Sequence, residues 1–465
     1  MSVHRPDSDV RIPPAQAVAE RLFNALSRFL HVEAVSGVVL LIAAAAALIW
    51  ANSPGGASYE HFWHVPLTFG LGSYVVSQPL HFWVNDGLMT IFFLVVGLEI
   101  RREMYEGALS SIRLAALPLV AALGGVVAPA LIYVSFNTDP LVHRGWAVPT
   151  ATDIAFAVGV LALLGRSIPS SIRILLLALA IIDDIAAVLI IALFYSSSLD
   201  PSGIILAGAG ILLVLAFQHL GFASAVVYII PGFVLWAGFL QIGIHPALAG
   251  VILGLMTPVV PPIRRERPVA FITRALNEFG ERVQTEEGLA DPRVLLEPVK
   301  QLKRAQRDIL PPVIRVQAAL HPWVAYGIMP LFALANAGVA IGGFDFHSAA
   351  TQSVMLGVLF GLVVGKPIGI FLASWIVVRI GWCELPPGAT WRGVALVGFL
   401  GGIGFTMAIF TANLAFSSNE LLNAAKLGVL AASGCAAVLG LAVGKLFVSG
   451  HRPRLPGEAA SNTAP

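Results

Sequence analysis

Long apolar runs recur along this sequence, and they constrain its fold more than any other feature. Only 12% of the residues are charged, whereas about a quarter are charged in an average soluble domain. Apolar helices of roughly 17 to 25 residues are long enough to cross the hydrocarbon core of a bilayer. The sequence therefore predicts an all-α polytopic membrane protein. Its spans, about twelve, are expected near 34–51, 80–100, 115–135, 147–165, 172–195, 203–217, 222–240, 242–259, 322–341, 354–379, 392–415 and 425–448.

The basic residues lie almost entirely on one side of the membrane that these spans define. All of the 28 Lys and Arg residues except Arg144, Lys366 and Lys426 fall in the two termini or in loops on the same side. By the positive-inside rule that side is the cytoplasm, so we expect both termini to be cytoplasmic. Membrane orientation accounts for these charges, and we expect membrane lipid but no nucleic acid as a partner.

The chain is expected to contain two membrane parts separated by a polar loop. Residues 34–259 carry the first eight predicted spans and residues 317–449 carry the last four. The residues between them, 260–316, are dense in charge and form a predicted cytoplasmic loop. An N-terminal segment, 1–33, and a tail, 450–465, complete the cytoplasmic side.

A short stretch near residues 65–79 differs from the spans because its apolar and polar residues alternate and turn residues interrupt it. This pattern predicts a small β-hairpin outside the membrane. The exposed edge of a strand can pair with a second copy of the same chain. We therefore predict a homodimer.

Two of the predicted spans contain residues that interrupt a helix. The fourth, 147–165, has Pro149 and Asp153 near its start, and the eleventh, 392–415, contains a cluster of glycines. Irregular backbone at membrane depth persists only where protein or a water-filled cavity surrounds it. Each interrupted span is the middle member of a group of three. We therefore predict inverted repeats whose two broken helices cross at the midplane of the bilayer.

Four charged residues lie deep within apolar spans. Of the 26 acidic residues, Asp153, Asp183 and Asp184 have this placement, and Lys366 is roughly 18 Å from either end of its span at the rise of an α-helix. Each charge at the centre of a membrane helix costs about 2.5 to 3.5 kcal/mol. We therefore expect the four to face one another and to carry the function.

The side chains of adjacent helical residues point about 100° apart. We therefore expect Asp183 to lean toward Lys366 and Asp184 to face a cavity near Asp153. Asp153 has an alternative role as the cap of a half-helix. Lys366 is either a structural ion-pair partner or a carrier of the transported proton.

Two neighbouring carboxylates in an apolar site cannot both stay charged without a counter-charge, so such a site takes up protons or a cation. Carboxylates, helped by the Thr152 hydroxyl and loosened carbonyl groups, suit a small alkali ion such as Na⁺ or Li⁺. Competition between that ion and H⁺ for the same oxygens, combined with alternating access, yields obligatory exchange. We expect no cofactor.

At these residues the sequence resembles the NhaA-type Na⁺/H⁺ antiporters of bacterial inner membranes. The matching stretches are ATDIAFAVGVLALLG at 151–165, ALAIIDDIAAVLIIALFY at 178–195, GKPIGI at 365–370 and GGIGFTMAIF at 401–410. The resemblance implies export of one Na⁺ for two H⁺ in a homodimer formed through the hairpin. That family is a known example of inverted repeats, so the resemblance and the two interrupted spans are not independent indications of a midplane site.

The resemblance also implies roles for individual residues. Asp183 and Asp184 become the pair that binds the cation and carries protons, with Lys366 as their basic partner. Thr152 and Asp153 mark the crossing point of the two unwound helices.

A second group of residues is implied to line the ion funnels or to respond to pH, and it consists of Asp86, Glu99, Glu103, His245 and His321. Asp86 and Glu99 are about 20 Å apart along one helix and so lie toward opposite faces of the membrane. Ordinary charged helix ends explain Glu103 equally well, and packing or hydrogen bonding explains His245 equally well.

One departure from the family concerns pH. Where the family often has Glu-His ahead of a second His before Pro-Trp, this chain has Gln317 and Ala318 in that region and keeps only His321. Two titratable groups of the implied pH sensor are absent, so we expect a different pH profile and an intact transport site.

Other functional classes fit parts of the same pattern. A proton-coupled transporter of another solute would also bury carboxylates, whereas a channel has no need of groups that must protonate. An intramembrane aspartyl protease also buries two Asp residues, but its pair faces across two helices. Asp183 and Asp184 are neighbours on one helix, so we expect a transporter rather than an enzyme.

Overall fold

The computed structural model describes residues 33–71, 74–107, 109, 111–165, 168–195, 200–222, 224–259, 311–342 and 348–449. The predicted N-terminal segment, nearly all of the charged loop and the predicted tail therefore lie outside the described residues.

The helices and strands have the following bounds: α2 (Glu33–Ala51), α3 (Gly56–His64), β1 (Pro66–Leu71), β2 (Tyr74–Pro79), α4 (Leu80–Phe82), α5 (Met89–Glu106), α6 (Ile112–Phe136), α7 (Pro140–His143), α8 (Ile154–Leu163), α9 (Ser170–Phe194), α10 (Pro201–His219), α11 (Ile229–Ile242), α12 (Leu248–Met256), α16 (Pro312–Trp323), α17 (Met329–Asn336), α18 (Ala349–Phe360), α19 (Lys366–Ile380), α20 (Trp391–Gly401), α21 (Phe405–Ala415) and α22 (Asn419–Ser449). Wider π-helical turns join α4 to α5, α16 to α17 and α18 to α19, and they lie at Trp83–Leu88, Val324–Ile328 and Gly361–Gly365.

The fold is helical and apolar throughout the described residues. Eight of the described helices are long and apolar enough to cross a membrane, and the total rises to 11 if each of three bent helix pairs is counted as one span. The prediction of an all-α polytopic membrane protein is confirmed.

One predicted span, 242–259, is shorter than expected. It folds as α12, a helix of 9 residues, which is about 14 Å long at the rise of an α-helix. Gly243 ends the preceding helix in the left-handed conformation, with φ 87°, and Thr257 leaves the helical conformation at the other end. Turn residues at both ends therefore shorten the helix, although the apolar run in the sequence is continuous.

Both predicted interruptions are present. Extended backbone separates the 3-10 segment Arg144–Thr150 from α8, and Gly402–Gly404 separate α20 from α21. Each interrupted pair is bent by 46°. The 3-10 segment packs against α21, and α8 packs against α20, so the two breaks lie together.

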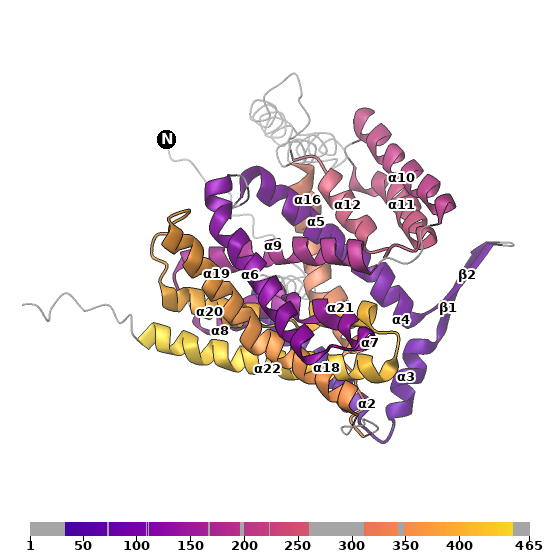
Figure 1. Ribbon diagram of the computed structural model, residues 1–465. Coiled ribbons are helices and arrows are strands. Elements are labelled where there is room, and N and C mark those ends of the chain that lie inside the picture. Colours follow the sequence, from indigo (N-terminus) through magenta and orange to yellow (C-terminus); the bar gives the residue numbers. More distant parts are fainter. Residues whose placement is uncertain are drawn as a thin grey trace, which may run out of the picture.

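The predicted hairpin is also present. Strands β1 and β2 pair antiparallel, with Pro66 opposite Pro79 and Leu71 opposite Tyr74. Figure 1 shows the hairpin projecting away from the helical body between α3 and α4. It is the one sheet in the described part of the chain.

Helices α6, α9 and α19 surround the breaks. Helix α6 packs against both α9 and α19, and Figure 1 shows α9 crossing the middle of the helical body. The backbones of α6 and α19 approach so closely at Gly124 and Gly369 that a Cβ atom on either would overlap the main chain of the other. This contact holds Lys366, the first residue of α19, inside the protein.

Candidate functional site

Helix α9 places two adjacent carboxylates in the centre of the protein. Asp183 and Asp184 lie in its middle, and their residues are 1% and 3% exposed. Both neighbouring turns are apolar, so the two aspartates are the polar part of an otherwise hydrophobic helix. The sequence thus sets the depth of these groups, and the packing around α9 removes them from solvent.

Lys366 is the cation that faces this pair. Its side chain is fully buried, and its ammonium lies 2.6 Å from Oδ2 of Asp183. The same ammonium donates a hydrogen bond to the carbonyl of Thr150, at the end of the first half of the interrupted span. Of the two aspartates it is therefore Asp183 that forms the ion pair.

Each of the two aspartates keeps an oxygen without a protein partner. Oδ1 of Asp183 and Oδ1 of Asp184 are buried and accept no hydrogen bond from the residues that the structure describes. A buried carboxylate oxygen without a donor is unfavourable by several kcal/mol unless a proton or a cation binds to it. These two oxygens are thus available to bind H⁺ or a hard cation.

Asp153 differs from that pair because both of its carboxylate oxygens have partners. Oδ1 accepts from the Phe156 amide at 3.0 Å, which caps α8. Oδ2 accepts from the Thr406 amide at 3.1 Å and from the Thr406 hydroxyl. Asp153 therefore joins the starts of two half-helices, and its capping role is present in the structure.

Backbone contacts connect the two breaks directly. The Asp153 amide donates to the Ile403 carbonyl at 2.7 Å, and the Thr152 hydroxyl donates to the Gly401 carbonyl at 2.8 Å. Buried backbone groups need partners, and here each break supplies the partners that the other has lost. The structure thus brings Thr152, Asp153, Asp183, Asp184 and Lys366 to one region of the protein, around the crossing of the breaks.

Three groups at this crossing escaped the sequence analysis: the Thr150 carbonyl, Thr406 and Ser433. Thr406 gives a local signal, because it is a polar residue two positions after the glycine-rich break. The Thr150 carbonyl has no sequence signal, since every residue has a carbonyl group. Ser433 is one hydroxyl within the long apolar helix α22, and its partner cannot be read from the local sequence.

The residues of the second implied group fall into three places. Asp86 and His245 lie together, with Oδ1 and Nε2 3.3 Å apart, and the His245 ring packs edge-on against Phe410 of α21. The last turns of α5 hold Glu99 and Glu103, while His321 is exposed on α16. Its helix, α16, packs against α5.

Arg102 organises the end of α5. Its guanidinium lies 3.2 Å from Glu103 and 3.9 Å from Glu99, and it donates to Oε1 of Gln317 on α16 at 3.1 Å. Gln317 is a neutral acceptor at this contact. Because the amide of Gln317 does not titrate, the partner of Arg102 on α16 has the same charge at every pH.

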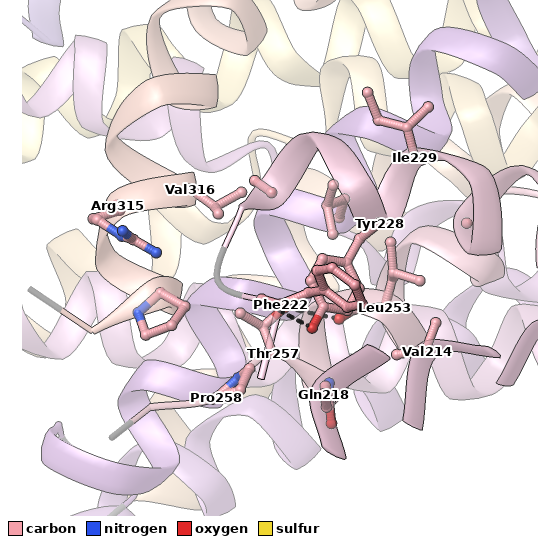
Figure 2. A pocket seen from close by; sticks show the side chains of 14 residues that line it. Val214, Gln218, Phe222, Tyr228, Ile229, Leu253, Thr257, Pro258, Arg315 and Val316 are labelled. Atoms are coloured by element: carbon pink, nitrogen blue, oxygen red, sulfur yellow. Dashed lines mark hydrogen bonds between the residues drawn. The ribbon is translucent and has the colours of Figure 1, made fainter. Parts of the chain in front are cut away.

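A cavity of about 240 Å³ lies apart from the buried carboxylates. Figure 2 shows its wall, to which α10, α11, α12 and α16 contribute Val214, Gln218, Ile229, Leu253 and Arg315 among others. None of its lining residues belongs to the predicted ion site. The candidate site is thus the closed cluster around α9 rather than this open pocket.

Comparisons with known proteins agree on one family. The family model described as Na⁺/H⁺ antiporter 1 matches residues 27–443. The chain is 65% identical over 433 residues to a Na⁺/H⁺ antiporter NhaA of Janthinobacterium sp. (strain Marseille). The aligned residues cover 93% of this chain and 95% of that protein. It is 60% identical over 444 residues to a Na⁺/H⁺ antiporter NhaA of Cupriavidus necator (96% and 94%). It is 54% identical over 446 residues to one of Bartonella henselae (96% and 98%).

Proposed function

The chain belongs to the Na⁺/H⁺ antiporter 1 family, and from this premise we propose that Na⁺ and H⁺ compete for the carboxylates of Asp183 and Asp184. The protein is a multi-pass membrane Na⁺/H⁺ antiporter and not an enzyme. The observation that carries the proposal is the buried pair of adjacent carboxylates, each with one oxygen that lacks a protein donor.

In the proposed cycle Asp184 exchanges Na⁺ for H⁺ most directly, because Asp183 is held by Lys366. Thr152 and the carbonyls of the breaks add neutral oxygen ligands, which suit Na⁺ and Li⁺. Two protons enter for each cation that leaves, so one net charge crosses per cycle. A membrane potential then drives export by about 2.3 kcal/mol per 100 mV.

The setting of this cycle is part of the same proposal. The protein lies in the bacterial inner membrane with both termini in the cytoplasm, and two copies associate through the edges of β1 and β2. Asp86 with His245, and Glu99 with Glu103, form polar entrances on opposite sides of the site. His321, which is exposed on α16, joins these residues in the proposed response to pH.

The test is Na⁺-dependent collapse of a preformed pH gradient in proteoliposomes. Asp184→Asn should abolish the exchange, and Asp183→Asn should abolish it or reduce it severely, because an amide can neither carry a proton nor balance a cation. Asp200→Asn is the matched control, since Asp200 is an exposed cap of α10 and asparagine caps a helix equally well. Normal transport by Asp184→Asn would refute the assignment.

Lys366→Ala tests the ion pair. Removing the ammonium leaves the Asp183 carboxylate buried without its counter-charge, which lowers the free energy of unfolding by about 3 to 5 kcal/mol. We expect a large drop in the melting temperature and impaired proton coupling, with a smaller change in apparent Na⁺ affinity. Unchanged melting and activity would contradict the pairing.

A further inference from the structure

Helix α21 begins inside the protein, directly after the second break, and its first amide groups need acceptors. The first four N–H groups of any α-helix have no partner within the helix. The residue at the cap position, Gly404, has no side chain and forms no side-chain cap. The partners must therefore come from other elements.

Two side chains from distant parts of the chain supply them. The Thr406 amide donates to Asp153, as described above. The Phe405 amide donates to Oγ of Ser433 at 3.0 Å, and Ser433 belongs to α22 and is 1% exposed. Asp153 and Ser433 thus cap α21 from outside its own span.

The position of Ser433 on α22 is specific for this task. Within its apolar helix Ser433 directs its oxygen at the start of α21, where that oxygen accepts from the Phe405 amide. One turn further along the same face, Ala436 Cβ lies 3.5 Å from where a Cβ of Gly402 would be. This face of α22 therefore contacts the second break at both of its ends.

We propose that Ser433 is a positioning residue for the ion site, an inference that rests on the proposed function. Ser433 fixes the start of α21. Through it, the carbonyls of Gly401 and Ile403 stay in register with Thr152 and Asp153. The cation ligands beside α9 depend on that register, although Ser433 itself touches neither carboxylate of the ion-binding pair in the described structure.

The experiment compares Ser433→Ala, Ser433→Cys and Ser433→Thr in proteoliposomes. Alanine removes the acceptor, and cysteine keeps the size of serine but is a weak acceptor. We expect both to raise the apparent KM for Na⁺ by about three- to tenfold, with a maximal rate within about twofold of the parent and a shifted pH profile, because one lost hydrogen bond of this kind corresponds to such a factor. Threonine keeps the hydroxyl and should restore the KM to within about twofold.

Two controls separate positioning from packing and from failure of the proposed function. Cys435→Ala, on the same helix at an exposed position, should leave KM, rate and pH profile unchanged. A parental KM and pH profile in both Ser433→Ala and Ser433→Cys would overturn the inference, as would an equal defect in Ser433→Thr. Asp184→Asn is assayed in parallel: if it transports normally, the proposed function fails, whereas an inactive Asp184→Asn beside an unaffected Ser433→Ala refutes only the role of Ser433.

Discussion

The two interrupted spans bend by the same 46° at their breaks, yet the breaks are built from different chemical groups. The first break carries polar side chains, Thr152 and Asp153, and Asp153 caps the half-helix that follows it. The second consists of Gly402, Ile403 and Gly404, and all of its polar groups belong to the backbone.

Irregular backbone within a membrane protein is therefore satisfied here in two ways. The first break supplies its own cap and also donates to the carbonyls of the second. The second break has no polar side chain that could cap a helix, so the start of α21 is capped by Asp153 and Ser433 from other spans. One break is therefore defined locally, and the other is defined by what packs against it.

Among variants of the two breaks, Asp153→Ala is expected to destabilise the protein most. This change removes the carboxylate that accepts from the amides of Phe156 and Thr406, which lie at the starts of two helices. With about 1 to 3 kcal/mol for each of the two buried amides left without a partner, we expect the free energy of unfolding to fall by roughly 2 to 6 kcal/mol. Thermal unfolding in detergent and Na⁺/H⁺ exchange both report this loss.

The matched control is Asp139→Ala, because Asp139 caps α7 at an exposed position. Its removal should cost about 1 kcal/mol. If Asp153→Ala melts no lower than Asp139→Ala, the first break does not hold both half-helices. Asp153→Asn, which keeps an acceptor oxygen, should retain much of the stability.

A smaller effect is expected at the second break, where the absence of a side chain is what matters. A Cβ at Gly404 would lie 2.9 Å from Ala408 Cβ and 3.0 Å from the Ala151 carbonyl oxygen. Gly404→Ala therefore forces the two breaks apart, and overpacking of this kind costs about 1 to 3 kcal/mol. We expect a lower melting temperature and slower exchange.

Gly434→Ala is the control for that change, because a Cβ there would meet no atom within 4 Å. Within a helix it should be neutral or stabilising by up to about 1 kcal/mol. Equal melting of the two variants would show that the second break tolerates a side chain.

The smallest expected effect comes from Thr152→Val, compared with Thr411→Val. Each removes one buried hydroxyl that donates to a carbonyl, in Thr152 to the other break and in Thr411 to Met407 of its own helix. Each should lower the free energy of unfolding by about 0.5 to 1.5 kcal/mol. Only Thr152→Val should weaken apparent Na⁺ affinity, and an equal KM in both variants would remove Thr152 from the ion site.

Much of the fold was predictable because hydrophobic transfer is a local property. A run of apolar residues, a buried charge or a glycine cluster changes the cost of insertion wherever the rest of the chain lies. The spans, the hairpin and both interruptions were therefore visible in the sequence. The short helix α12 was not, because its apolar run continues past the turn residues that divide it.

The apolar pattern of the sequence is enough to place Asp153, Asp183, Asp184 and Lys366 within predicted membrane spans. The pairing of Asp183 with Lys366 was expected from the sequence, but the two partnered oxygens of Asp153 and the capping of α21 by Ser433 were visible only in the folded chain. The physical reason is the range of the interactions: a hydrogen bond is decided within a few tenths of an ångström. Those that join the breaks connect residues 249 to 253 positions apart in the chain.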